Sequence, residues 1–152
     1  MKKYLILGHL GLGDHILCNG IYRHFSKISQ KVVIPVKKHN LHSLQMMLLD
    51  RSNVEFFVVK DTNNLKEISE SINLIFGNTH EIIKLGYFGE SFLTADNINY
   101  DENFYLQAGV PFTNRWDDFE FSINQKNAAE ICDITSITTK YDFVHDDKEL
   151  NF

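Results

Sequence analysis

The sequence predicts an α/β fold: a Rossmann-like parallel sheet flanked by helices. Short apolar runs alternate with longer amphipathic stretches along the first half of the chain, as expected for successive strand–helix units. A glycine-rich loop at residues 8–13 joins the first run to the first amphipathic stretch. The chain has 152 residues, 43% of them hydrophobic, which is enough for one core and roughly one domain.

The first predicted unit is a buried strand followed by a helix. Residues 4–7 form a short apolar run, which is typical of a parallel strand that is covered on both faces. Residues 16–28 carry apolar side chains at three- and four-residue steps, which predicts a helix with one buried stripe. The stripe consists of Leu17, Ile21, Phe25 and Ile28.

Two further units follow. The β-branched residues 31–36 predict a second strand with Pro35 near its end, and residues 53–59 predict a third. Between them, residues 39–49 predict a helix whose inward side chains are Leu41, Leu44, Met47 and Leu48. After the third strand, Asp61 or Thr62 is expected to cap a helix. That helix runs through Leu65, Ile68 and Ile72.

The pattern weakens toward the C-terminus. Short strands are expected at residues 74–76, 81–85 and 119–121, and the stretch 96–103 has the composition of a loop. A short helix is expected at residues 104–109 before Val110-Pro111, and a weak one at 124–132. Residues 141–145 predict a last strand that opens a new unit. We therefore expect a domain over residues 1–140, followed at 141–152 by a linker or a truncated second domain.

Composition excludes several classes of protein. The formal net charge is −5, so general affinity for nucleic acid or for an anionic membrane is not expected. No apolar run approaches the roughly 20 residues that a transmembrane helix needs. Two cysteines are too few for a disulfide framework, which favours a reduced, cytoplasmic protein.

The glycine loop does not match the common nucleotide motifs. Gly8, Gly11 and Gly13 have the spacing G-x-x-G-x-G rather than G-x-G-x-x-G, and the second strand carries no acidic residue for a ribose. No Lys-Ser/Thr pair follows, as a P-loop requires. A nucleotide-binding oxidoreductase fragment is therefore disfavoured. The backbone amides remain able to line an anion or a sugar.

Asp14 follows this loop directly and has two interpretations. It is well placed to cap the helix, because an aspartate at a helix start accepts hydrogen bonds from the first amides. It is also a candidate general base, a carboxylate at the edge of a cleft within reach of a substrate hydroxyl. Capping would favour the ionised form and make Asp14 a weaker base.

The segment 10–17, followed by Asn19-Gly20 and Arg23, resembles the opening of the heptosyltransferase-like enzymes of glycosyltransferase family 9. The resemblance implies one half of a GT-B fold, in which the N-terminal domain binds the acceptor and the Asp of the Gly-Asp pair, here Asp14, is the proposed base. It also implies a nucleotide-sugar as co-substrate, bound by a second domain or a partner chain, with neither a cofactor nor a catalytic metal.

Other residues are candidates for the acceptor site. They are Gly11, Leu12 and Gly13 of the loop, with His15, Arg23 and Trp116. Arg23 either reaches an acidic acceptor group or pairs with a surface carboxylate, and Trp116 is either a sugar-stacking wall or a seal for the last helix. Cys18 is expected to be a small buried residue.

Histidine pairs carry weaker signals. His9 and His15 flank the loop and are able to contact a phosphate or a sugar, whereas His39 and His42 have metal-compatible spacing without a third ligand.

The leading hypothesis is therefore the acceptor-binding domain of a glycosyltransferase, which transfers a sugar from a nucleotide-sugar to a glycan or lipid-linked acceptor. The alternative is a non-catalytic Rossmann-like module that binds a carbohydrate or a protein.

Overall fold

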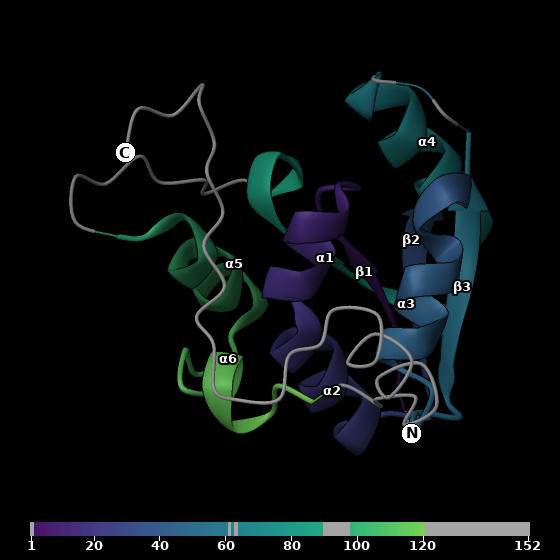
Figure 1. Ribbon diagram of the computed structural model, residues 1–152. Helices are drawn as coiled ribbons and strands as arrows, with labels where there is room; N and C mark the ends of the chain where they lie inside the picture. The colour runs from purple at the N-terminus through teal and green to yellow at the C-terminus, as the bar shows by residue number, and fades with distance from the viewer. Residues whose placement is uncertain (1, 61, 63, 90–97, 121–152) are drawn as a thin grey trace, which may run out of the picture. The chain divides into compact units, whose positions relative to one another are not determined.

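The computed structural model describes residues 2–60, 62, 64–89 and 98–120, and all structural statements below refer to these. Four strands form a parallel sheet in the order β3-β2-β1-β4 (Figure 1). They are β1 (Lys3–Leu7), β2 (Lys31–Lys37), β3 (Val54–Val59) and β4 (Glu81–Lys84). The α/β, Rossmann-like fold class predicted from the sequence is confirmed.

Helices cover both faces of the sheet. They are α1 (Leu12–Leu17), α2 (Asn19–Ile28), α3 (Leu41–Met47), α4 (Leu65–Phe76), α5 (Tyr100–Ala108) and α6 (Asn114–Asp117), with short 3-10 turns η1 (Lys38–Asn40) and η2 (Gly86–Phe88). Helices α2, α3 and α5 pack on one face and α4 on the other. Because α4 leads from β3 back across the sheet to β4, a right-handed crossover places it opposite the helices that join β1, β2 and β3.

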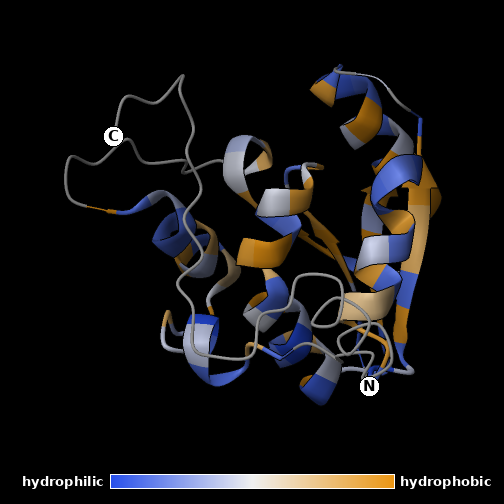
Figure 2. Ribbon diagram, in the orientation of Figure 1, coloured by the Kyte–Doolittle hydropathy of each residue, from blue (hydrophilic) through white to orange (hydrophobic). Residues whose placement is uncertain are grey.

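Strand β1 shows how the two-residue period divides the core. Tyr4 and Ile6 belong to the cluster under α2, α3 and α5, whereas Leu5 and Leu7 belong to the cluster under α4. The two central strands, β1 and β2, are therefore buried on both sides, as their apolar residues predict (Figure 2).

Pro35 lies within β2, an interior strand of the sheet. Proline has no N–H for a ladder hydrogen bond. The pairing of β2 with β1 ends at Val33, whereas the pairing with β3 continues to Lys37. Beyond the ladder, the Asn40 side-chain amide donates to the carbonyl of Leu10 over 3.0 Å, so a side chain ties these two chain segments together.

The structure corrects the helix predicted at residues 16–28. Helical structure begins earlier, at Leu12, and is interrupted at Cys18, whose ψ of 4° departs from helical geometry. Within the predicted stripe, Ile21 and Phe25 are buried, but Ile28 is 52% exposed. The helical period alone therefore predicts a longer buried stripe than α2 has, because the last turn of this helix is exposed at Ile28.

Two further predictions in the middle of the chain were wrong. Residues 74–76 are the end of α4 rather than a strand, and Leu74 lies on the solvent face of this helix. The cap of α4 is Asn64, whose side chain accepts a hydrogen bond from the amide of Glu67. Thr62 lies two residues earlier and accepts a hydrogen bond from the amide of Asn64, while Asp61 lies outside the described residues.

Downstream, α5 begins at Tyr100, so residues 100–103 are helical where a loop was predicted. It ends at Gly109 in the left-handed conformation, directly before the predicted stop at Val110-Pro111. Residues 119 and 120 are not in a strand. The predictions for residues 124–132 and 141–145, and the boundary at residue 140, lie outside the described residues.

Candidate functional site

The strand order identifies one edge of the sheet as the place for a ligand. From β1 the chain adds β2 and then β3 on one side, and returns to add β4 on the other. In open α/β sheets, ligands bind outside the carboxyl ends of the strands at this switch point. Here the loop after β1 and the turn η2 after β4 meet, because the amide of Tyr87 donates to Nε2 of His9 over 3.0 Å.

A chain of hydrogen bonds leads from η2 to the predicted base. His9 Nδ1 lies 2.6 Å from the hydroxyl oxygen of Tyr100, and this hydroxyl donates to Oδ1 of Asp14 over 2.9 Å. Three segments that are distant in the sequence thus converge: the loop after β1, the turn after β4 and the first turn of α5. Asp14 accepts the last hydrogen bond of this chain.

Gly86 makes the approach of His9 to the sheet edge possible. Its φ is +63°, in the left-handed region, and a Cβ at this position would lie 2.3 Å from Nε2 of His9. Glycine is therefore required both for the conformation and for the space. The amide of Gly86 in turn donates to Gln107 of α5 over 2.6 Å, which holds η2 against that helix.

Asp14 is not a capping residue. The N-cap of α1 is Gly11, and no side chain caps this helix. Among the described residues, none donates a hydrogen bond to Oδ2 of Asp14. This oxygen lies over Gly11, because a Cβ built there would be 2.7 Å from it.

The carboxylate of Asp14 is held in its ionised form. His9 and the Tyr100 hydroxyl lower the pKa of Asp14, and partial burial opposes them without reversing the direction. Conversely, burial and the hydrogen bond to Asp14 raise the pKa of Tyr100, so the phenol keeps its proton and remains the donor.

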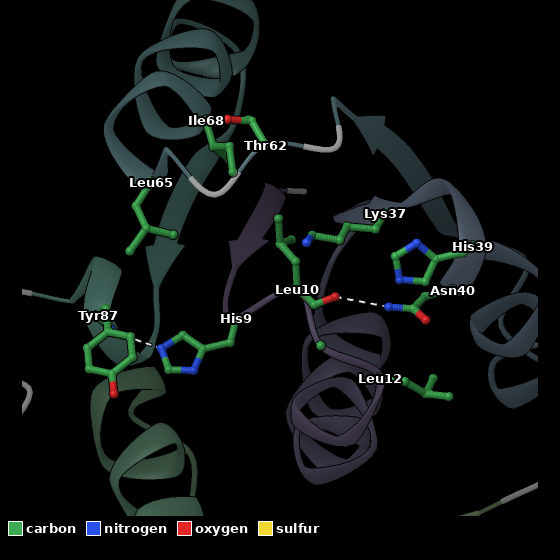
Figure 3. Close-up of a pocket in the computed structure, with 11 residues that line it drawn as sticks. His9, Leu10, Leu12, Lys37, His39, Asn40, Thr62, Leu65, Ile68 and Tyr87 are labelled. Atoms are coloured by element: carbon green, nitrogen blue, oxygen red, sulfur yellow. Dashed lines mark hydrogen bonds between the residues drawn. The ribbon is translucent and has the colours of Figure 1, made fainter.

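Beside this network lies a cavity of about 430 Å³ (Figure 3). Residues 9–12 form its inner wall, and the segments that follow β2, β3 and β4 complete it. The side chains that line it from the end of β2 and from these segments are Lys37, His39, Asn40, Thr62, Leu65, Ile68 and Tyr87. The cavity therefore sits along the carboxyl edge of the sheet and mixes apolar surface with polar and cationic groups.

Tyr87 supplies an aromatic plane at one side of the cavity. Its ring stacks on His9, with 4.4 Å between the ring centroids and 18° between the planes, and the residue is 65% exposed. An exposed aromatic ring with a polar tip suits a ligand that is apolar on one face and hydroxylated at its edge. Figure 3 shows Lys37, His39 and Asn40 on the opposite side of the cavity.

Only some of the predicted loop residues line the cavity. Gly11 and Leu12 line the cavity, and Asp14 adjoins it through Gly11. Gly13 is exposed within α1. His15 is buried and does not line the cavity, and its Nδ1 lies 2.8 Å from the hydroxyl of Tyr22. Burial lowers its pKa to about 4, so the imidazole is neutral.

Arg23 and Trp116 lie apart from the cavity. Arg23 is fully buried, and its guanidinium pairs with Asp50 at 2.8 and 2.9 Å, which agrees with the ion-pair interpretation rather than with a role in ligand binding. Trp116 is 66% exposed, with the Arg115 guanidinium 4.6 Å from its ring centroid, so it does not seal α6 onto the sheet.

Cys18, His39 and His42 were also singled out in the sequence. Cys18 is buried, and this burial raises the pKa of its thiol, as expected for a packing residue. His39 lines the cavity, but His42 lies on α3 outside that lining. Across the described ranges, no group of three or more His, Cys, Asp or Glu side chains is arranged to hold a metal ion. Within the same ranges, none of the helices combines the length and apolarity of a bilayer crossing.

Sequence reasoning missed Tyr87 and Tyr100. Tyr100 is 86 positions from Asp14, and no local pattern connects the two. The one available signal was Gly86, since a glycine directly after a strand favours a turn with positive φ.

Comparison with known proteins returns no match: no family model, curated protein or solved structure aligns with this chain.

Proposed function

We propose that this chain is the acceptor-binding domain of a sugar transferase of the GT-B type, similar to glycosyltransferase family 9, with Asp14 as general base. The acceptor hydroxyl attacks the anomeric carbon of a nucleotide-activated sugar, and a new C–O bond forms there. The bond to the nucleotide breaks, and the nucleoside diphosphate leaves with its electron pair. The hydroxyl proton passes to Oδ2 of Asp14.

The observation that carries this proposal is that the two carboxylate oxygens of Asp14 have different surroundings. Oδ1 accepts the hydrogen bond from Tyr100, whereas Oδ2 lies against Gly11, which lines the cavity. An ionised carboxylate with one oxygen tied and the other at the wall of a ligand-sized cavity is suited to accept a proton.

A lowered pKa makes Asp14 a weak base, yet this suits the reaction. A sugar hydroxyl is far too weak an acid to lose its proton before attack, but it becomes strongly acidic as its oxygen bonds to the anomeric carbon. The base therefore has to be ionised and well placed rather than strong. His9 and Tyr100, which lower the pKa of Asp14, keep it ionised at neutral pH.

The cavity supports a saccharide acceptor. Its volume of about 430 Å³ lies in the range of small-ligand sites. The ring of Tyr87 offers a stacking face, and Asn40 and Thr62 offer hydrogen-bonding groups for hydroxyls. The donor nucleotide-sugar is assigned to a second domain or a partner chain, because the glycine loop lacks the dinucleotide and P-loop spacings.

The proposal is tested with Asp14→Asn, which preserves shape and removes the base. Nucleoside diphosphate release is measured from a panel of nucleotide-sugars and acceptor glycans, with the chain supplied in the longest reading frame that contains it. We expect a loss of about 10²–10⁴-fold in transfer. Binding of the acceptor glycan to the isolated chain, measured by NMR, should change only a few-fold. Asp117→Asn, at an exposed position of α6, is the matched control.

Three results would contradict this assignment. Full transfer activity in Asp14→Asn removes Asp14 as the base. Tight binding of a nucleotide-sugar in the cavity exchanges the roles of donor and acceptor. Glycan binding without transfer for any donor favours the non-catalytic module.

A further inference from the structure

The hydrogen-bond chain that ends at Asp14 has one fixed direction. A backbone amide is only a donor, so the amide of Tyr87 obliges Nε2 of His9 to accept. The neutral imidazole then carries its proton on Nδ1, which donates to the hydroxyl oxygen of Tyr100. The phenolic proton is thereby turned toward Oδ1 of Asp14.

We infer that His9 is a positioning residue that acts on Asp14 through Tyr100. This inference rests on the proposed role of Asp14 as base. By directing the Tyr100 proton to Oδ1, His9 fixes the rotation of the carboxylate and leaves Oδ2 facing the cavity wall at Gly11. The turn after β4 thus controls the orientation of a carboxylate on α1.

The same geometry excludes a proton relay from Asp14 to His9. Nδ1 already carries the proton that it donates to Tyr100, and Nε2 is occupied by the amide of Tyr87. A proton from Asp14 would enter the imidazole only if one of these bonds broke. The proton that Asp14 accepts on Oδ2 therefore leaves without passing to His9, which keeps its own proton on Nδ1.

Packing holds each member of the chain in place. The ring of Phe104 meets both His9 and Tyr100 edge to face, at centroid distances of 5.4 and 4.9 Å. The titratable groups near Asp14 are His9 from the loop, whose Nδ1 lies 3.7 Å from Oδ1, Tyr100 from α5, and the buried His15, Cys18 and Tyr22. The last three are uncharged at neutral pH, because burial lowers the pKa of His15 and raises those of Cys18 and Tyr22. The orientation of the carboxylate therefore depends on His9 and Tyr100.

Two substitutions of His9 separate its two nitrogen atoms. In His9→Asn, the side-chain amide nitrogen takes the place of Nδ1 and still donates to Tyr100. In His9→Gln, the amide oxygen takes the place of Nε2 and keeps the bond to Tyr87, but the donor to Tyr100 is lost. Tyr100→Phe removes the final bond to Asp14 and keeps the ring that packs on Phe104. Tyr105→Phe is the control, since its hydroxyl on the same helix donates to the carbonyl of Leu17 instead.

The readouts are the titration of the Asp14 carboxyl by ¹³C NMR in the full chain and the pH profile of transfer. We expect Tyr100→Phe and His9→Gln to raise the pKa of Asp14, to move the acid limb of the profile to higher pH and to lower transfer at neutral pH roughly tenfold. His9→Asn should restore the wild-type titration, and Tyr105→Phe should leave it unchanged.

The outcomes are distinguishable from those of the proposed function. An unchanged Asp14 titration in both Tyr100→Phe and His9→Gln overturns the inference, as does a His9→Asn variant no better than His9→Gln. If the titration shifts as expected while Asp14→Asn transfers sugar normally, the proposed function is wrong and the control of Asp14 by His9 stands.

Discussion

Replacing Arg23 with methionine should lower the free energy of unfolding by about 3–5 kcal/mol. The Arg23 side chain is 1% exposed, and besides Asp50 it donates to Oδ1 of Asn19 over 2.9 Å and to the carbonyl of Met47 over 3.1 Å. These two acceptors are buried, and each costs about 1–3 kcal/mol when it loses its donor. The carboxylates of Asp50 and Glu120, which also pair with Arg23, are 35% and 65% exposed and recover hydration, and the methionine side chain retains apolar contacts. The expected total therefore lies within the sum of the two losses, about 2–6 kcal/mol.

Lys27→Met is the matched control on the same helix. Lys27 pairs with Asp118, but its side chain is 48% exposed. Exposed pairs of this kind contribute about 1 kcal/mol or less. The same change in side-chain type therefore tests burial rather than charge, and the two variants should differ by at least about 2 kcal/mol.

The assay is urea unfolding followed by circular dichroism, with thermal unfolding beside it. A loss of 3–5 kcal/mol corresponds to roughly 6–20 °C in Tm for a chain of this size. Binding of acceptor glycans by the folded variant should be unchanged, because Arg23 is buried and does not line the cavity. Equal stabilities of Arg23→Met and Lys27→Met would refute this reasoning, as would a folded Arg23→Met that no longer binds the acceptor.

Two further predictions concern the packing behind the site. Gly20→Ala should destabilise the protein by about 3 kcal/mol or more in urea unfolding, because its Cβ would lie 2.2 Å from the carbonyl oxygen of Asn114, whereas Gly13→Ala meets nothing within 4 Å and serves as the control. Burial lowers the pKa of His15 from 6.5 to about 4. Between these pH values the unfolded chain protonates this imidazole and the folded chain does not. The free energy of unfolding should therefore fall by up to about 1.4 kcal/mol per pH unit as the pH decreases. His15→Asn should flatten that slope, and an unchanged slope in this variant would contradict the assignment.

The sheet was predictable from sequence because parallel strands buried on both faces are continuously apolar. Residues 4–7 and 31–36 each match the observed strand within one residue at either end. Burial of Leu44 and Met47 followed equally from the helical period. Such local patterns are dictated by which face meets the core, and they require no knowledge of distant segments.

Helix ends and breaks were less predictable because they depend on single contacts. Leu74 continues an apolar run but lies on the outer face of α4, where propensity for a helix outweighs exposure of one side chain. The interruption at Cys18 is followed by Gly20, which approaches the carbonyl of Asn114. That contact brings α6 against α2, and its partner is 94 residues away in sequence. No local pattern encodes it.

The residues of the candidate site likewise differ in how far the sequence predicts them. Asp14 was identifiable because the strand, the glycine loop and the helix are contiguous in the sequence. Tyr87 and Tyr100, which orient it together with His9, come from η2 and α5, and their relation to Asp14 arises only when the chain returns to the far side of β1. Arg23 illustrates the converse error, since its position on the first amphipathic stretch suggested a ligand contact although its own side chain is buried and pairs with Asp50.

Three neighbours of Asp14, namely Cys18, Tyr100 and His15, are uncharged at neutral pH. Burial raises the pKa of the Cys18 thiol and, together with the bond to Asp14, that of Tyr100, so both stay protonated, while His15 stays neutral because burial lowers its pKa to about 4. A base that shared its titration range with such neighbours would share its proton with them and change charge only partly. Here Cys18 and Tyr100 titrate far above the range in which the carboxylate takes up its proton. His15 differs from them, because its pKa of about 4 lies near the acidic range in which a carboxylate titrates. Under the proposed function, Cys18 and Tyr100 therefore do not contribute to the acid limb of the transfer profile, and the hydrogen-bonded chain from Tyr87 through His9 sets the position of the Asp14 carboxylate.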